Sequence, residues 1–334
     1  MTSRAGFTTA FTSAICWLTI GLPLTAQTTP PQATTSPHST NSAPQQPQAM
    51  PLAPPSGFLL SPGDEANLNK LLTDWENANT NIRTFKCTFT RWEYDPAIVG
   101  GNPNQPVALS KGELKYAAPD KGMFKVEEQT NYVPDPKTGQ FVEQKVKPTE
   151  WWTCNGKSMF EVTVRDNQTL VVEKPLPPEM QGKAITEGPL PFVFGARAET
   201  LKTRYYLRMI TPAAAAKTDV WLEAYPKLQK DAANFSHVTL ILSKADLQPT
   251  AIQIFNPGAN TQNPARTVIQ LENPSINNPW APLENLFDDF ARPNPLGAKH
   301  VLEQNAIPPP ATTQLPAGNT TDNSQASRGK PPAR

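Results

Sequence analysis

The sequence contains very little of the chemistry on which metal sites and hydrolases depend. It has three histidines and three cysteines in 334 residues. No histidine pair stands at a metal-binding spacing, and Cys-x-x-Cys, Gly-x-Ser-x-Gly and phosphate-binding glycine motifs are missing. The net charge of +1 also excludes the basic excess that is typical of a nucleic-acid or membrane-surface binder. These absences predict a protein that is not an enzyme, holds no metal or cofactor and binds no nucleic acid.

A few residues keep chemical alternatives open. Cys154 and His237 could meet in space as nucleophile and base, although a strand cysteine beside a tight turn is more often structural. Asp288-Asp289 offers two carboxylates, which is too few for a calcium site. Arg91 and its aromatic neighbours could contact a ligand, and cross-strand pairing in a sheet explains them equally well.

Proline is abundant, with 38 residues that gather towards the two ends of the chain. Residues 27–57 and 306–334 combine proline with Thr, Gln, Ser and Asn and contain few apolar side chains. Such segments cannot bury enough surface to offset the entropy of ordering, so we expect them to be disordered. The intervening residues 58–305 are enough for one large β-rich domain.

Residues 1–26 have the pattern of a secretory signal peptide. Arg4 is the only charge, residues 14–22 are apolar, and Leu24-Thr-Ala26 offers a small-residue cleavage site. The apolar run is shorter than the roughly 20 residues that span a bilayer, which favours a cleaved signal over an uncleaved anchor. We therefore predict export to the periplasm or cell envelope, with no stable transmembrane segment after cleavage.

Export would allow Cys87 and Cys154 to form a disulfide, because both would reach an oxidising compartment. Both lie in predicted strands, so a bridge requires that their side chains share a face and that their Cα atoms approach within about 7 Å. The alternative is two buried, unreactive thiols.

The spacing of apolar residues predicts one helix followed by a sheet. Ser61-Pro62 is a helix start, and Leu68, Leu71, Leu72 and Trp75 recur at helical spacing on one stripe. A second short helix is expected at residues 191–201, and a long polar loop at residues 130–148. Period-two alternation joined by short turns predicts antiparallel strands at residues 84–95, 107–117, 123–129, 151–162, 169–174, 205–211, 219–225, 235–243, 249–255 and 266–273.

The strongest local signal is Asn155-Gly156, in the middle of the predicted hairpin 151–162. A type I′ turn needs positive φ at both central positions, and Asn-Gly supplies them most readily. The hairpin should form part of the sheet wall, with Phe160 or Trp152 facing whatever lies beneath.

Several short motifs occur in a recognisable order. Phe85-Lys-Cys-Thr-Phe89 lies in the first strand, Gly112-Glu-Leu begins a stretch that ends at Pro119, Asn155-Gly-Lys157 follows, and Leu190-Pro-Phe192 comes later. This order resembles the periplasmic lipoprotein carriers of the Lol pathway, the LolA/LolB-like proteins. Residues 220–226 and 247–253 resemble still more closely a planctomycete-type family of exported proteins. The arginine that latches the lid in the carriers is replaced here by Ala118.

The resemblance covers about residues 62–302. It implies an α+β, mainly β fold: a strongly curved, incomplete antiparallel β-barrel with a few helices covering its concave face. It also implies a non-enzymatic binding or carrier protein for a lipid, a lipoprotein or another hydrophobic ligand. Partners would be acyl chains, or envelope proteins recruited by the proline-rich tails. The alternative is a structural or interaction module with a filled core. The expected wall residues are Phe85, Phe89, Leu114, Tyr116, Phe124, Phe160, Phe192 and Phe194.

Overall fold

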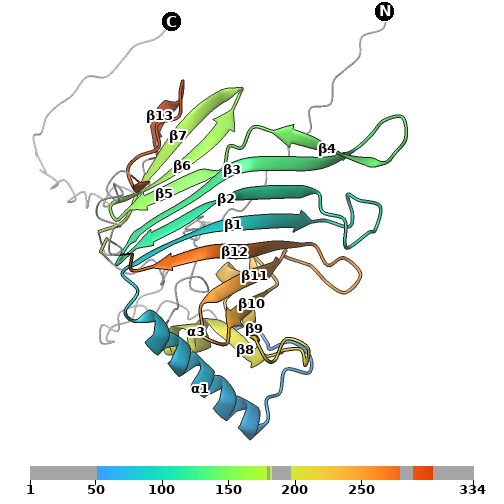
Figure 1. Ribbon diagram of the computed structural model, residues 1–334, viewed down its shortest axis with the longest axis vertical. Helices are drawn as coiled ribbons and strands as arrows, with labels where there is room; N and C mark the ends of the chain where they lie inside the picture. The colour runs from blue at the N-terminus through green and yellow to red at the C-terminus, as the bar shows by residue number, and fades with distance from the viewer. Residues whose placement is uncertain (1–50, 179–180, 183–196, 279–288, 304–334) are drawn as a thin grey trace, which may run out of the picture. The chain divides into compact units, whose positions relative to one another are not determined.

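The computed structural model describes residues 51–178, 181–182, 197–278 and 289–303. The signal-like residues 1–26 and the tail 306–334 lie outside this part. The described residues form one 13-stranded sheet and three helices (Figure 1). The elements are α1 (Pro62–Asn79), β1 (Thr84–Tyr94), β2 (Ala108–Ala117), β3 (Lys121–Pro134), β4 (Phe141–Val146), β5 (Trp151–Asn155), β6 (Ser158–Arg165), β7 (Gln168–Pro175), α3 (Ala198–Arg204), β8 (Tyr205–Met209), β9 (Asp219–Pro226), α4 (Gln229–Ala232), β10 (His237–Ser243), β11 (Pro249–Phe255), β12 (Arg266–Ile276) and β13 (Lys299–Leu302).

The strand order is β13-β7-β6-β5-β3-β2-β1-β12-β11-β10-β9-β8, and β4 pairs with β3 beside this path. Neighbouring strands are antiparallel except β13, which runs parallel to β7. The first strand lies in the middle, because β1 pairs with β2 on one side and with the late strand β12 on the other. The β-rich, unclosed and curved sheet confirms the predicted fold class (Figure 1).

Helix α1 begins and packs as its sequence predicts. The Ser61 side chain accepts a hydrogen bond from the Asp64 backbone N–H at 3.2 Å, which satisfies one free donor of the first turn. Its apolar stripe is buried, with Trp75 fully enclosed. The helix contacts β8 and α3, so the described helices gather at the β8 end of the sheet (Figure 1). None of the helices in the described residues is long and apolar enough to cross a membrane.

The predicted hairpin is present as β5 and β6, with its turn one residue later than expected. The central residues are Gly156 and Lys157, since Asn155 still belongs to β5 and pairs across to Ser158 at the start of β6. Gly156 has φ +87°, and Asn155 instead closes the turn with its side chain, which accepts from the Lys157 and Ser158 backbone N–H groups at 2.9 Å each. The asparagine therefore acts through an Asx turn and not through positive φ.

Residues 130–148 differ from the loop that the sequence predicted. Strand β3 continues to Pro134, and β4 pairs back along it as a second hairpin. The polar composition hid this pair, because most of β4 is exposed and shows no apolar face. The second helix also starts later than predicted: the described helix is Ala198–Arg204, and residues 191–196 lie outside the described residues.

Residues 51–60 lie against the sheet, although most of them belong to the segment that was expected to be disordered. The Leu52 backbone N–H donates to the Lys227 carbonyl at 2.7 Å, and the Tyr206 hydroxyl donates to the Leu52 carbonyl at 2.8 Å. Phe58 packs edge-on against Tyr206 and Tyr225 at ring separations of 5.8 and 5.7 Å. The ordered region therefore begins before residue 58.

His237 lies in an aromatic stack on the same surface. Its ring is 4.9 Å from the ring of Tyr225 and 3.9 Å from that of Phe255, centre to centre. Burial disfavours the charged imidazolium, and so lowers the pKa of His237, with Arg208 adding to the effect against the opposing influence of Glu223.

Candidate functional site

The two faces of the sheet differ sharply around β1. Phe85, Cys87, Phe89 and Arg91 alternate along β1 and are buried on one face, which we call the inner face. Side chains from β2, β3 and α1 join the first three in one apolar core cluster, so the inner face is also the side on which the helices pack. The intervening side chains of β1, such as Lys86, lie on the opposite, outer face.

Three aromatic rings form a row across the inner face, which we call the aromatic row. Phe89 stacks on Phe124 at 4.5 Å between ring centres, and Phe124 stacks on Trp152 at 5.9 Å. Phe89 lies on β1 and Phe124 on β3, with Gly112 of β2 between them. The absence of a side chain at Gly112 leaves room for the Phe89 ring to reach across β2. The row begins in the core and ends at Trp152, which is only partly buried.

A buried arginine lies beside the aromatic row. Arg91 has 1% of its side chain exposed, and its Nη2 contacts the carboxylates of Glu150 at 2.7 Å and Glu93 at 3.3 Å. The same nitrogen donates to the Ser110 hydroxyl at 3.3 Å, and the guanidinium carbon lies 5.8 Å from the centre of the Phe124 ring. Burial disfavours the cation, but the two carboxylates outweigh it and hold the pKa of Arg91 above its ordinary value.

The structure brings together most of the predicted wall residues that it describes. One apolar cluster on the inner face contains Phe85, Phe89, Leu114, Tyr116 and Phe124. Their role in binding a ligand stays a prediction. Phe192 and Phe194 lie outside the described residues.

Phe160 is on the wrong face for this wall. It pairs with Thr153, whereas Trp152 pairs with Glu161, so Phe160 and Trp152 point to opposite sides of the sheet. Phe160 packs in a separate outer cluster with Val162 and Val171. Of the two residues named for the hairpin, only Trp152 reaches the inner face.

Cys87 and Cys154 are free and buried, so the predicted disulfide is not formed. They lie on β1 and β5, and β2 and β3 run between them. Three strand spacings of about 4.8 Å separate them by roughly 14 Å, twice the reach of a disulfide. Burial, reinforced by Glu113, raises the pKa of Cys87 to about 12, and burial also raises the pKa of Cys154.

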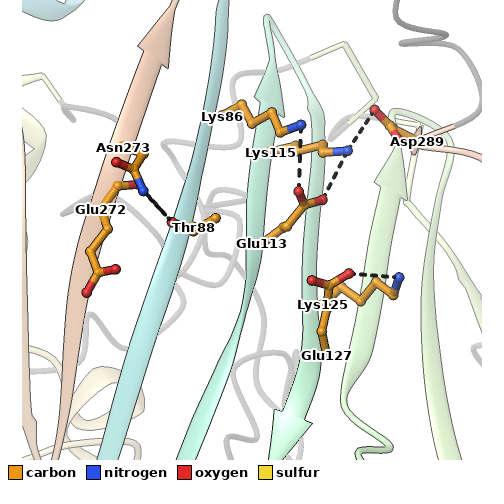
Figure 2. Close-up of polar contacts among 9 residues, drawn as sticks. All are labelled: Lys86, Thr88, Glu113, Lys115, Lys125, Glu127, Glu272, Asn273 and Asp289. Carbon is orange, nitrogen blue, oxygen red and sulfur yellow. Dashed lines mark hydrogen bonds and ion pairs between the residues drawn. The ribbon is translucent and has the colours of Figure 1, made fainter.

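Around β1 and β2 the outer face carries a ladder of charged residues. Glu113 contacts Lys86 at 3.6 Å and Lys115 at 3.3 Å, and Lys115 reaches Asp289 at 3.0 Å (Figure 2). Burial opposes the Glu113 charge, but the two lysines outweigh it and lower the pKa of Glu113. Asp289 is therefore engaged in an ion pair, and the ladder fastens the segment that follows residue 288 to the sheet.

The chemical alternatives find no support in the described residues. Five strands separate Cys154 on β5 from His237 on β10, so the two cannot act as a dyad. No group of three or more His, Cys, Asp or Glu side chains in the described part of the chain could hold a metal ion. Sequence reasoning missed Glu150, Glu93 and Ser110 as partners of Arg91, although the period-two spacing from Phe89 to Arg91 was a signal that both share a face.

No protein-family model matches the sequence, and no curated protein matches it. Among solved structures, the fold is similar to the MucA/MucB complex of Pseudomonas aeruginosa (12% identity, 64% of this chain, 58% of that chain, TM-score 0.29). It is also similar to a DUF1329 family protein from Desulfovibrio piger (8%, 67%, 98%, TM-score 0.31). A third is a LolA superfamily protein from Nitrosomonas europaea (8%, 63%, 94%, TM-score 0.23). The chain spans less than two thirds of the MucB chains, and at such TM-scores the similarities say nothing about function.

Proposed function

We propose that this chain is an exported, non-catalytic protein that binds a lipid, a lipoprotein or another hydrophobic ligand in the cell envelope. The aromatic row carries this proposal, because it leads from the core of an unclosed sheet to the partly exposed Trp152. Stacked aromatic rings offer a broad apolar surface, which is the main component of hydrophobic ligand sites.

The placement of the helices supports the same proposal. Helices α1 and α3 contact β8, at one edge of the sheet, whereas the aromatic row lies on β1, β3 and β5. The helices therefore make their main contacts with the sheet on a different strand from those that carry the row. Of the three rings, only Trp152 is partly exposed, so an acyl chain would meet the row at Trp152 and gain about 25 cal/mol for each Å² of apolar surface buried there.

The cellular location is part of the proposal and rests on sequence. Residues 1–26 would direct export and be removed, and residues 27–57 and 306–334 would flank a domain of residues 58–305. Contacts of residues 51–60 with the sheet extend that domain slightly at its N-terminal end. The periplasm or another envelope compartment would then be the site of action.

A second candidate is a structural or interaction module of the envelope. The observation in its favour is that Phe85, Phe89, Leu114, Tyr116 and Phe124 are each at most 8% exposed. A filled inner face of this kind would leave recruitment of partner proteins to the proline-rich tails.

Two adjacent tryptophans provide a matched test. Trp152 and Trp151 lie on opposite faces of β5, so Trp152→Ala removes the end of the aromatic row and Trp151→Ala does not. Titration of the full chain with the neutral fluorophore N-phenyl-1-naphthylamine should give saturable binding that Trp152→Ala weakens about fivefold or more, since loss of one stacked ring costs about 1 kcal/mol or more. Trp151→Ala should bind like the wild type. No saturable binding, or equal effects of the two variants, would favour the interaction module.

A further inference from the structure

Two of the three guanidinium nitrogens of Arg91 have no hydrogen-bond partner within the described residues. These are Nε and Nη1, and both are fully buried. The third nitrogen, Nη2, makes all the contacts with Glu150, Glu93 and Ser110. Folded proteins satisfy the great majority of buried polar groups, and an unmade bond costs about 1–3 kcal/mol. Two buried donors without a partner therefore indicate a place where a ligand acceptor could bind.

The unpaired donors lie beside the aromatic row. The Arg91 guanidinium is 5.8 Å from the centre of the Phe124 ring, the middle member of the row. Its partner carboxylates reach solvent, because the side chains of Glu150 and Glu93 are 24% and 19% exposed. The apolar row thus lies next to a polar cluster that is in contact with water on one side. An amphiphilic ligand likewise has an apolar part next to a polar part.

The charge of the cluster selects the kind of acceptor. The guanidinium is already engaged by two carboxylates through Nη2, so a ligand anion beside it would be repelled by the carboxylates of Glu150 and Glu93. An uncharged oxygen can accept hydrogen bonds from Nε and Nη1 without this repulsion. Carbonyl oxygens of esters and amides are uncharged acceptors that occur next to acyl chains.

We propose that Nε and Nη1 of Arg91 bind the carbonyl oxygen of an uncharged ester or amide on an acyl-chain ligand, whose hydrocarbon part lies along the aromatic row. This inference rests on the proposed hydrophobic-ligand function and names the chemical class of the ligand. Arg91 acts as a specificity-determining residue, because its free donors strengthen the binding of a ligand with an uncharged carbonyl and do not strengthen the binding of a carboxylate.

Three probes of equal chain length test the inference on the wild-type full chain. Methyl dodecanoate carries an uncharged carbonyl, dodecyl methyl ether lacks it, and dodecanoate is an anion. Each is titrated against bound N-phenyl-1-naphthylamine. The ester should displace the fluorophore at a concentration about tenfold lower than the ether, as expected for one or two hydrogen bonds to a charged donor. Dodecanoate should do no better than the ether.

Arginine variants identify the responsible side chain. In Arg91→Met the advantage of the ester over the ether should vanish. The control Arg208→Met removes an arginine that pairs with Glu223 on the outer face, and should preserve the full advantage. If Arg91→Met fails to fold, the Nε–H resonance of Arg91 in the wild type decides: it should shift on addition of the ester and not of the ether.

The outcomes separate this inference from the function on which it rests. If N-phenyl-1-naphthylamine does not bind at all, both are overturned. If it binds and the ester and ether displace it equally, the role of Arg91 is overturned while hydrophobic binding stands. Tighter binding of dodecanoate than of the ester overturns the preference for an uncharged ligand.

Discussion

At Gly112 of β2, the backbone of β3 and the Phe89 ring lie so close that a side chain has no room. Gly112→Ala tests whether this close packing is needed. A Cβ atom at this position would overlap the backbone carbonyl oxygen of Lys125 and would lie 2.9 Å from the Phe89 ring. Real Cβ atoms essentially never come within 3.0 Å of a neighbour. Because one of the neighbours is main chain, the strand pair must move apart.

The expected loss follows from two opposing contributions. Overpacking costs about 1–3 kcal/mol, and replacing glycine restricts the unfolded chain, which returns about 0.4–1 kcal/mol. The free energy of unfolding of Gly112→Ala should therefore fall by about 1–2 kcal/mol. For a domain of this size that corresponds to a Tm lower by about 2–8 °C. Displacement of Phe89 should also weaken binding of N-phenyl-1-naphthylamine.

Gly63→Ala is the matched control. It lies in the first turn of α1, where the nearest atom to the new Cβ would be the Ser61 hydroxyl at 3.8 Å. Alanine is the better helix former by about 0.5–1 kcal/mol, so this variant should be at least as stable as the wild type. Scanning calorimetry of both variants should give Tm shifts of opposite sign. An unchanged or higher Tm for Gly112→Ala would refute the packing described around the aromatic row.

Three further predictions concern stability and reactivity. In protein lacking residues 1–26 and kept under non-reducing conditions, a thiol reagent should label neither Cys87 nor Cys154 in the folded state and both in the unfolded state. Failure to label either cysteine in the unfolded protein would contradict the free thiols. Because burial lowers the pKa of His237, its contribution to the free energy of unfolding is present above about pH 6.5 and is lost as pH falls through the pKa of the folded state. In urea denaturation at several pH values, His237→Phe should show a smaller fall in the free energy of unfolding over this range. The same pH dependence in wild type and variant would contradict this role of His237. Trp75→Ala should cost about 3–5 kcal/mol in the same assay, and a loss below about 1 kcal/mol would contradict its full burial.

Period-two alternation was sufficient to predict much of the site. It placed Phe85 and Phe89 on one face of the first strand, and Leu114 and Tyr116 on one face of the second, as the structure has them. The same alternation assigns Arg91 to the face of Phe89, yet a charged side chain gives no sign of its partners. Glu150 follows an unpredicted hairpin, so the sequence could not show that it returns to Arg91.

The errors come from register and from long-range pairing. A two-residue turn pairs even-numbered with odd-numbered positions, so Trp152 and Phe160 were bound to face opposite sides, and counting across the turn would have shown it. The cysteine prediction failed for a different reason. Whether β1 adjoins β5 depends on the order of strands in space, and two strands that come between them in the chain also lie between them in the sheet.

Hydrophobic ligand binding is the central claim, and native mass spectrometry tests it most directly. The full chain is purified from its own cell envelope without detergent exchange and measured beside Trp152→Ala and Trp151→Ala. The account predicts extra mass of an uncharged acyl ester or amide on the wild type and on Trp151→Ala, and much less of it on Trp152→Ala. Uniformly ligand-free wild type, which also takes up no fluorescent fatty acid ester, would contradict the claim.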